Sequence, residues 1–417
     1  MFKPFSNRSL WAASVLIGAT VGPATATEPL QGRYLFVSCG VALEGPTTGA
    51  VDCRAETPKR NLRDLEFTAF EYLATWVEEA PEDLGREGYG FAFVAPVDPE
   101  TGAVQVDLAA PMPFLAPSVR DYANGPEWAL SQRGPEVFFT CNDAATAMPS
   151  LCRLSRFQTG DWQLSQVADS VGFMAKDPRR NPSARVPKTH YEVRDSGPKI
   201  YGYRVDRPRN PRDVDIPLGL ASGRWMRDGR RLLLTEMAPQ SRNVVALDAE
   251  TGVFTRFFDD GVSRSFAFPF AAPELNGDDA IAVKIDPVTG TVGADVAIYR
   301  PTDDGRWERW STIPPICPEY PYTSSHAPFV VGDRSFMTFV SHAGDNGLVD
   351  PGVIWIATVD PDLPPERQVR QLVSPLSCGE DPINRRDPEA LALINQDAAR
   401  IYFLVADIDV PDEFLDP

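Results

Sequence analysis

The sequence predicts an all-β protein, a single β-propeller of seven blades, with six blades as the alternative. Three observations lead to this class. One turn sequence recurs along the chain, a second pattern recurs about every 50 residues, and short runs of aromatic and β-branched residues lie between Pro and Gly. The chain of 417 residues holds 40 Pro and 30 Gly, which disfavours long helices.

The apolar runs have the length of strands. Good examples are 34–37, 91–94, 136–140, 231–235 and 401–405. The one segment with apolar residues near helical spacing is 64–79, which is a helix candidate although parts of it also fit a strand.

The recurring turn has the form Asp-x-x-Thr-Gly. It is found at 98–102, 248–252 and 286–290, each time between two apolar runs. Asp and Thr side chains can bond the turn backbone, and Gly accepts a positive φ. We therefore expect three hairpin turns between strands.

The second pattern is expected where the first strand of a blade begins. It reads Gly125-Pro126-Glu127-Trp128, Ser222-Gly223-Arg224-Trp225, Ala272-Pro273-Glu274-Leu275, Ser325-His326-Ala327-Pro328-Phe329 and Asp387-Pro388-Glu389-Ala390. A period near 50 suits four-stranded blades. The predicted blades are 64–112, 122–168, 184–218, 220–261, 266–313, 322–375 and a last one from 386. The short region 184–218 leaves six blades open.

The last predicted blade has room for only about two strands. Residues 30–56 can supply the missing ones, so we expect the N-terminal segment to pair with the last blade and close the ring.

The segment Arg224-Trp225-Met226-Arg227-Asp228-Gly229 and the run up to Thr235 resemble the Trp-Ser-Pro-Asp-Gly blade signature of TolB-type propellers. The stretch 243–252 is similar to the hairpin that follows that signature. The resemblance covers one blade well and the others in outline, as expected of a repeat fold related to WD-repeat propellers. It implies a fold and no function.

The N-terminus indicates export. Lys3 and Arg8 precede an apolar stretch, 9–22, and Ala24-Thr25-Ala26 fits a signal peptidase site. We therefore expect a signal peptide at 1–26, a single domain at 27–417 and a periplasmic or secreted location. No later run reaches the roughly 20 apolar residues of a membrane span.

Six cysteines follow the predicted cleavage site, an even number that favours disulfides in an exported protein. Proximity along the chain suggests the pairs Cys39 with Cys53, Cys141 with Cys152, and Cys317 with Cys378. Other connectivities stay open.

The formal net charge of -18 argues against a nucleic acid partner, since phosphate binding relies on Lys and Arg. We expect a monomer whose partner is a protein or a glycan. With three His and no Cys-x-x-Cys motif, we expect no metal site of His or Cys and no cofactor. Calcium is the one open alternative, at the acidic turns 259–261, 277–279 and 303–305.

The candidate site follows from the blade pattern. Five residues at the predicted starts of the innermost strands should converge on one mouth of the channel: Glu127, Arg224, Glu274, His326 and Glu389. Glu127, Arg224 and His326 are the candidate binding residues. A binding propeller is one reading. The other is a carbohydrate-active enzyme, a glycoside hydrolase with Glu274 and Glu389 as its catalytic pair. The same carboxylates can instead be structural, capping amides or pairing with arginine.

Overall fold

The computed structural model describes the parts of the chain that build the sheets. These are residues 34–43, 51–55, 63–68, 72–79, 90–105, 108, 110–111, 119–131, 134–143, 149–156, 162–169, 171–174, 189–194, 199–204, 207–215, 220–226, 228, 230–237, 242–248, 251–258, 260–285, 295–313, 322–342, 352–363, 369–371, 385–393 and 398–406. Residues 1–26, the predicted signal peptide, lie outside them.

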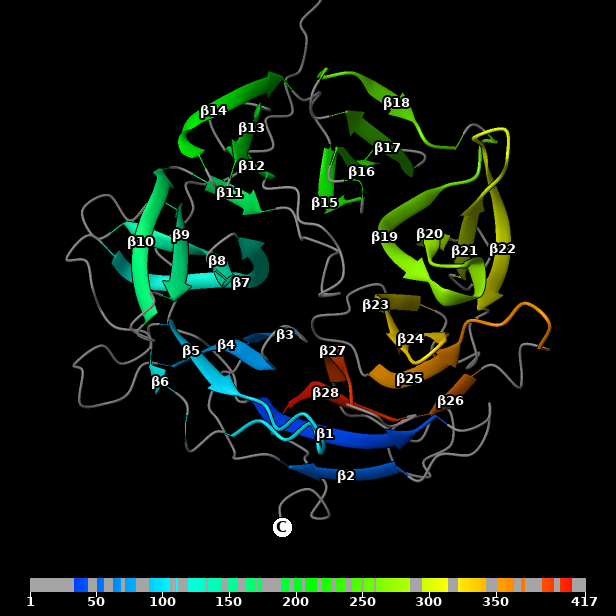
Figure 1. The fold of residues 1–417 in the computed structure, drawn as a ribbon, viewed down its shortest axis with the longest axis horizontal. Helices are drawn as coiled ribbons and strands as arrows, with labels where there is room; N and C mark the ends of the chain where they lie inside the picture. The colour runs from blue at the N-terminus through cyan, green and yellow to red at the C-terminus, as the bar shows by residue number, and fades with distance from the viewer. Residues whose placement is uncertain are drawn as a thin grey trace, which may run out of the picture.

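The described strands form seven four-stranded antiparallel sheets, which Figure 1 shows around a common centre. Six of the sheets are consecutive in the chain and are called blades 1 to 6. Blade 1 holds β3 (Arg63–Thr68), β4 (Leu73–Glu79), β5 (Gly90–Pro96) and β6 (Ala110–Pro111). Blade 2 holds β7 (Val119–Ser131), β8 (Gly134–Asp143), β9 (Pro149–Arg156) and β10 (Trp162–Asp169). Blade 3 holds β11 (Val171–Met174), β12 (Thr189–Arg194), β13 (Lys199–Arg204) and β14 (Arg207–Asp215).

The remaining blades lie on the other side of the ring in Figure 1. Blade 4 holds β15 (Leu220–Trp225), β16 (Arg231–Met237), β17 (Arg242–Asp248) and β18 (Phe254–Arg256). Blade 5 holds β19 (Arg264–Ala272), β20 (Asp278–Ile285), β21 (Val296–Pro301) and β22 (Trp307–Ile313). Blade 6 holds β23 (Tyr322–Val331), β24 (Arg334–His342), β25 (Gly352–Thr358) and β26 (Val369–Gln371). The all-β prediction is confirmed.

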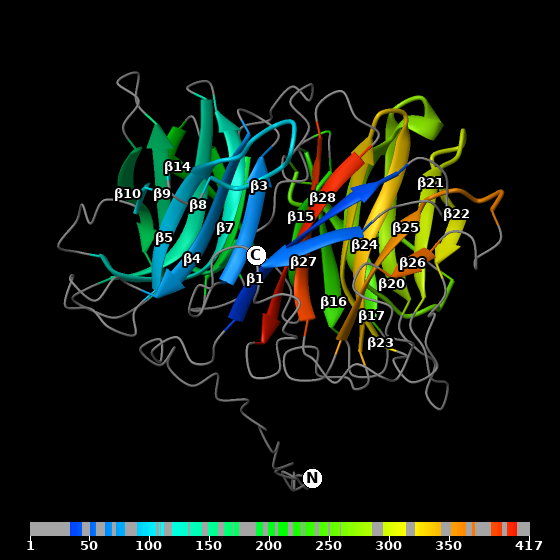
Figure 2. The ribbon, with the colours of Figure 1, turned by 90° about the horizontal axis from the view of Figure 1, so that it is seen from below.

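The seventh sheet, called the composite blade, joins strands from the two ends of the described chain. Its order is β2-β1-β28-β27, where β1 is Tyr34–Ala42, β2 is Val51–Ala55, β27 is Arg385–Ala392 and β28 is Ala398–Ala406. The β1–β28 ladder runs from the pair Tyr34–Ala406 to the pair Ala42–Ala398. Figure 2 shows the sheets from the side, standing around the central axis.

The core lies between the sheets. One apolar cluster packs β16 and β17 of blade 4 against blade 5, and another packs blade 5 against Met337 and Phe339 of blade 6. A third joins blade 6 to Val41 and Ile401 of the composite blade. Because both faces of such a sheet are covered, its strands read as continuous apolar runs. All of β25 is buried for this reason.

The helix expected at 64–79 is wrong. That segment forms β3 and β4, with a turn at Tyr72, whose φ is 49°. Phe67, Leu73 and Trp76 are all buried there. A strand buried on both faces carries apolar residues at consecutive positions, which imitates helical spacing over a short window. A 3₁₀ turn, η3 (Pro273–Leu275), follows β19. No helix of the described residues is long and apolar enough to cross a membrane.

Two copies of the Asp-x-x-Thr-Gly turn are described, and both have the expected contacts. In the first, Asp98 Oδ1 accepts bonds from the amides of Glu100 at 2.8 Å and Thr101 at 3.0 Å. In the second, Asp248 Oδ1 accepts a bond from the Thr251 amide at 2.9 Å. The φ angles of Gly102 and Gly252 are 69° and 73°. The third copy, at 286–290, lies outside the described residues.

The first of these turns, residues 98–102, packs on the composite blade and is called the docked turn. Arg400 of β28 donates from Nε to Thr101 O at 2.8 Å and from a terminal nitrogen to Ser38 Oγ of β1 at 2.6 Å. The Tyr402 hydroxyl donates to Gly102 O. Both Arg400 and Tyr402 are buried. The docked turn therefore joins blade 1 to both ends of the described chain.

Cys39 and Cys152 are disulfide-bonded. The backbone register places Cys53 opposite Cys39, and it places Cys141 on β8, the strand that pairs with the strand of Cys152. Both positions agree with the pairs suggested by proximity, which stay a prediction. Cys317 and Cys378 lie outside the described residues.

The docked turn predicts a difference between two glycine substitutions. An added Cβ at Gly102 lies 2.8 Å from Arg400 Cβ and 2.8 Å from Leu393 Cδ2, whereas at Gly305 it meets nothing within 4 Å. Both glycines have positive φ, so Gly305→Ala carries backbone strain alone, about 1 kcal/mol. Gly102→Ala also pushes the turn away from Arg400, for a total of about 2–4 kcal/mol. Urea unfolding of the two variants measures this. Equal losses of stability in the two variants would mean that the docked turn does not pack on the composite blade.

Candidate functional site

The innermost strand of six sheets contains the same irregularity. In β3, β7, β15, β19, β23 and β27, two consecutive residues are skipped in the pairing with the next strand, for example Phe266 and Ala267 in β19. These strands lie nearest the centre in Figure 1. A bulge of this kind bends the strand and re-aims the side chain that follows it.

The bulge supplies a register with which the blades can be compared. The first paired residue after it is Glu66 in blade 1, Glu127 in blade 2, Arg224 in blade 4, Phe268 in blade 5, Ala327 in blade 6 and Glu389 in the composite blade. We call these the post-bulge positions. Glutamate occupies three of them, and those three belong to consecutive sheets, the composite blade and blades 1 and 2.

This register corrects the expected alignment of the site. Glu127, Arg224 and Glu389 are equivalent, but none of the three begins its innermost strand, because each follows the bulge inside it. His326 is the second residue of the bulge in β23. Glu274 lies in η3, beyond the end of β19. The side chains of Glu127 and Glu389 lie outside the described residues.

Glu274 contacts the next blade. Its Oε1 accepts a bond from the Ser335 amide at 2.5 Å, and its Oε2 accepts a bond from the Ser335 hydroxyl at 2.7 Å. Ser335 is buried at the start of β24. Pro273 opens η3, and Asn276 ends it with a φ of 56°. The 3₁₀ turn thus presents the carboxylate to blade 6, so Glu274 joins two blades.

His326 is also held between blades. Its side chain is 1% exposed, and its Nε2 lies 2.7 Å from the carbonyl oxygen of Phe266 in the bulge of β19. Because a carbonyl only accepts, Nε2 carries the proton. The pKa of His326 is lowered to about 3, mainly by burial and also by the positive charges of Lys284 and Arg224, against the opposing hydrogen bond to Phe266. The imidazole is therefore neutral near pH 7 and serves as a donor between blades 5 and 6.

The Phe266 peptide is bonded on both sides. Its amide donates to Thr235 Oγ1 of blade 4 at 3.0 Å, while its carbonyl accepts from His326 of blade 6. Phe266 has a φ of 53°, in the left-handed region. The bulge leaves the backbone groups of Phe266 unpaired within their own sheet, so the neighbouring blades can bind them. These two bonds link blades 4, 5 and 6 near the centre of the ring.

Arg224 and His326 meet at one aromatic ring. The Arg224 guanidinium carbon lies 4.4 Å from the centroid of the Phe268 ring. The His326 ring packs edge-on against the same ring, with centroids 4.7 Å apart. The three residues come from blades 4, 5 and 6. Arg224 and Phe268 are partly exposed, so the contact between these two innermost strands offers a cationic and aromatic surface.

Sequence reasoning missed Glu66, Phe268 and Lys284. Glu66 is a buried carboxylate at the post-bulge position of blade 1. No Pro or Gly precedes Glu66 or Phe268, so the pattern that located the other blades gave no signal. Lys284 on β20 and Thr235 on β16 occupy the same register position. Each lies two residues after the residue that pairs with the post-bulge residue of its own blade.

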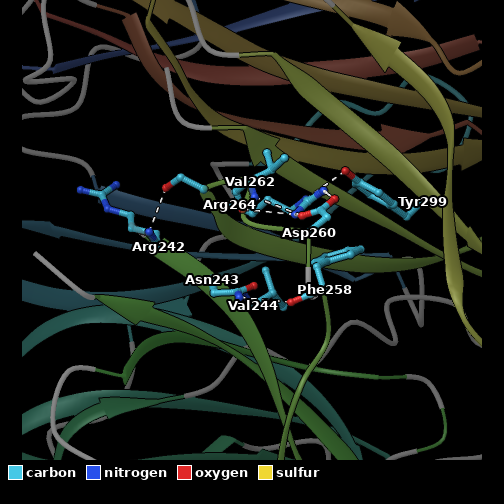
Figure 3. Close-up of polar contacts among 9 residues, drawn as sticks. Arg242, Asn243, Val244, Phe258, Asp260, Val262, Arg264 and Tyr299 are labelled. Carbon is cyan, nitrogen blue, oxygen red and sulfur yellow. Dashed lines mark hydrogen bonds and ion pairs between the residues drawn. The ribbon is translucent and has the colours of Figure 1, made fainter. Parts of the chain in front are cut away.

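A second polar cluster fixes the start of β19 (Figure 3). The buried Arg264 forms a two-bond contact with Asp260, both distances 2.5 Å, and donates from Nε to the Tyr299 hydroxyl at 2.9 Å. Its guanidinium also lies 4.3 Å from the Phe258 ring centroid. The hydrogen bonds from Arg264 hold the pKa of Asp260 at about 2. This cluster anchors the connection from blade 4 to the innermost strand of blade 5.

The acidic turns named for calcium can be followed in part. Asp260 is bound by Arg264, and Asp304 is bound by Thr302 and Arg306 at the hairpin between β21 and β22. In the described ranges no group of three His, Cys, Asp or Glu residues is placed to hold a metal.

The seven sheets and the bulged inner strands define a β-propeller, and at the level of the fold the chain resembles TolB-type propellers. No protein-family model and no curated protein sequence matches it. Among solved structures it is similar to a periplasmic gluconolactonase from Pseudomonas aeruginosa, at 16% identity over 84% of this chain and 97% of that one, with a TM-score of 0.45. It is also similar to TolB from Acinetobacter baumannii, at 14% identity over 69% and 64%, with a TM-score of 0.37. A third similar structure is a puromycin-hydrolyzing peptidase from Mycobacterium tuberculosis, at 14% identity over 79% and 56%, with a TM-score of 0.44. At these identities the likeness concerns fold alone.

The buried His326 predicts a pH dependence of stability. In the unfolded chain this imidazole titrates near 6.5, and in the folded chain at about 3, so between these values the unfolded state binds more protons. The free energy of unfolding should therefore fall as pH drops through this window, by about 1.4 kcal/mol per pH unit from this group.

His326→Gln keeps a donor for Phe266 O but does not titrate. The difference between the two proteins in chemical denaturation at pH 7, 6, 5 and 4 isolates the contribution of His326, because all other groups are common to both. Parallel pH profiles would show that the imidazole is not held neutral.

Proposed function

We propose that this chain is an exported seven-bladed propeller, closed by the β1–β28 pairing, that binds a protein or glycan ligand at the mouth of its central channel. The predicted leader at 1–26 and the even number of cysteines support a periplasmic or secreted monomer with one domain at 27–417. The paired ladder between the two ends of the described chain supports the closed ring.

The observation that carries the binding function is the partly exposed Arg224–Phe268 contact on the inner wall. Other groups hold the backbone nearby: Thr235 and His326 bind the bulge of β19, and Arg264 anchors the start of that strand. A cationic residue stacked on an aromatic ring is a common element of recognition surfaces, where arginine and aromatic residues contribute much of the binding energy.

The alternative is a carbohydrate-active enzyme that uses carboxylates of the channel. Of the two glutamates named for that role, Glu274 is engaged by Ser335 and serves as a contact between blades. What favours the alternative is the shared register of Glu66, Glu127 and Glu389 on three consecutive sheets, since glycoside hydrolysis needs a pair of carboxylates. Glu389 belongs both to the catalytic pair named from the sequence and to this shared register.

One pair of variants tests the proposal. The mature chain, Glu389→Gln and the control Glu308→Gln are applied to a glycan array and to purified envelope proteins, and they are assayed for hydrolysis of pooled polysaccharides. Glu308 lies in an exposed pair with Arg300, 2.7 Å apart, and its loss should leave stability and binding unchanged.

The proposal predicts saturable binding by the mature chain and by Glu308→Gln, weakened in Glu389→Gln at an unchanged melting temperature, with no turnover. Turnover that Glu389→Gln abolishes would establish the enzyme instead. If the mature chain shows neither binding nor turnover, both functions are refuted.

A further inference from the structure

Arg224 differs from its equivalents in the other sheets. Of the six post-bulge positions in the described strands, three hold glutamate, two hold the uncharged residues Phe268 and Ala327, and Arg224 is the one with a positive charge. The bulge gives these positions the same relation to their strands. By register, therefore, the glutamates belong to the composite blade and blades 1 and 2, and the arginine belongs to blade 4.

The Arg224 guanidinium is oriented by stacking. Its carbon lies 4.4 Å from the Phe268 ring centroid, and Phe268 is fixed in turn by the edge of His326 and by the apolar cluster between blades 5 and 6. A guanidinium that stacks through its face forms its hydrogen bonds through its edge, in a planar fork that matches the two oxygens of a carboxylate.

A second cation reinforces the charge on this side. Lys284, on β20 next to the bulge of β19, is partly exposed and acts on His326 together with Arg224, since both charges lower the pKa of that imidazole. His326 itself stays neutral and adds no charge.

We propose that Arg224, seated on Phe268 and assisted by the charge of Lys284, binds a carboxylate group of the channel ligand. The inference rests on the proposed binding function and adds the chemistry of the ligand: an organic anion whose carboxylate faces blades 4 and 5. A neutral ligand gains nothing from these two positive charges.

The test uses small carboxylates as probes of the mature chain. Acetate and benzoate are titrated at constant ionic strength, with benzamide as the uncharged analogue of benzoate, and the arginine Nε–H resonances are followed by NMR. We expect one arginine resonance to shift with saturation for both carboxylates, more tightly for benzoate because of the Phe268 ring, and to stay unchanged with benzamide.

Arg224→Gln should lose that resonance and weaken benzoate binding about tenfold or more, the usual loss when a charge-assisted hydrogen bond is removed. The matched control is Arg230→Gln in the same blade, which removes an equal charge from an exposed pair with Asp248 at 2.6 Å. It should bind benzoate as the unchanged protein does.

Three outcomes would overturn the inference. They are no saturable shift in the unchanged protein, equal binding by Arg224→Gln, or equal loss in Arg230→Gln. The first needs no variant, so a folding defect in Arg224→Gln leaves the test intact. If the mature chain captures a glycan or a protein and Arg224→Gln captures it equally well, the carboxylate site is refuted while the binding function stands. If neither the carboxylate titration nor the capture assay detects binding, the carboxylate site and the binding function are both refuted.

Discussion

The pairing of β1 with β28 is the constraint on which the rest of the structure depends. It brings together segments from the two ends of the described chain, and the entropy of closing so long a loop must be recovered by contacts at the junction. The contacts there are buried or partly buried. Arg400 binds Ser38 of β1 and Thr101 of the docked turn, and Arg334 of blade 6 donates to Leu43 O at 2.8 Å. Without β1 and β2, the last two strands would form an isolated hairpin, which is marginal on its own.

The positions of the innermost strands depend on the contacts between neighbouring sheets. Each sheet is positioned by its neighbours, through apolar clusters and through a few polar links such as Thr235–Phe266–His326. The post-bulge positions keep equivalent places in their sheets only if these links hold every innermost strand at the same height. A break at the composite blade would therefore affect the position of Arg224 on the far side of the ring.

Much of the fold followed from local chemistry in the sequence. The turn at 98–102 has the contacts expected of its Asp, Thr and Gly, because they depend only on neighbouring residues. The apolar runs 231–235 and 401–405 lie in β16 and β28 for the same reason. The segment 64–79 was misassigned because burial on both faces removes the alternation that distinguishes a strand from a helix.

The site was less accessible from sequence, since its register depends on a bulge that leaves no fixed residue signature. Glu127, Arg224 and Glu389 were aligned correctly with one another. Glu274 matched the same Pro-Glu pattern but belongs to η3, where that pair opens a turn of 3₁₀ helix. The roles of Glu274 and His326 as links between blades depend on Ser335 and Phe266, which are distant in sequence.

Native-state hydrogen exchange of the β1 and β28 amides tests the central claim most directly. If the pairing closes the ring and holds it together, amides of both strands that bond across the ladder should exchange only through global unfolding, with the same free energy as the buried β25. Exchange of the β1 amides at a much lower free energy than β25 would contradict this account, because the ring would then open at this pairing while the other blades stay folded.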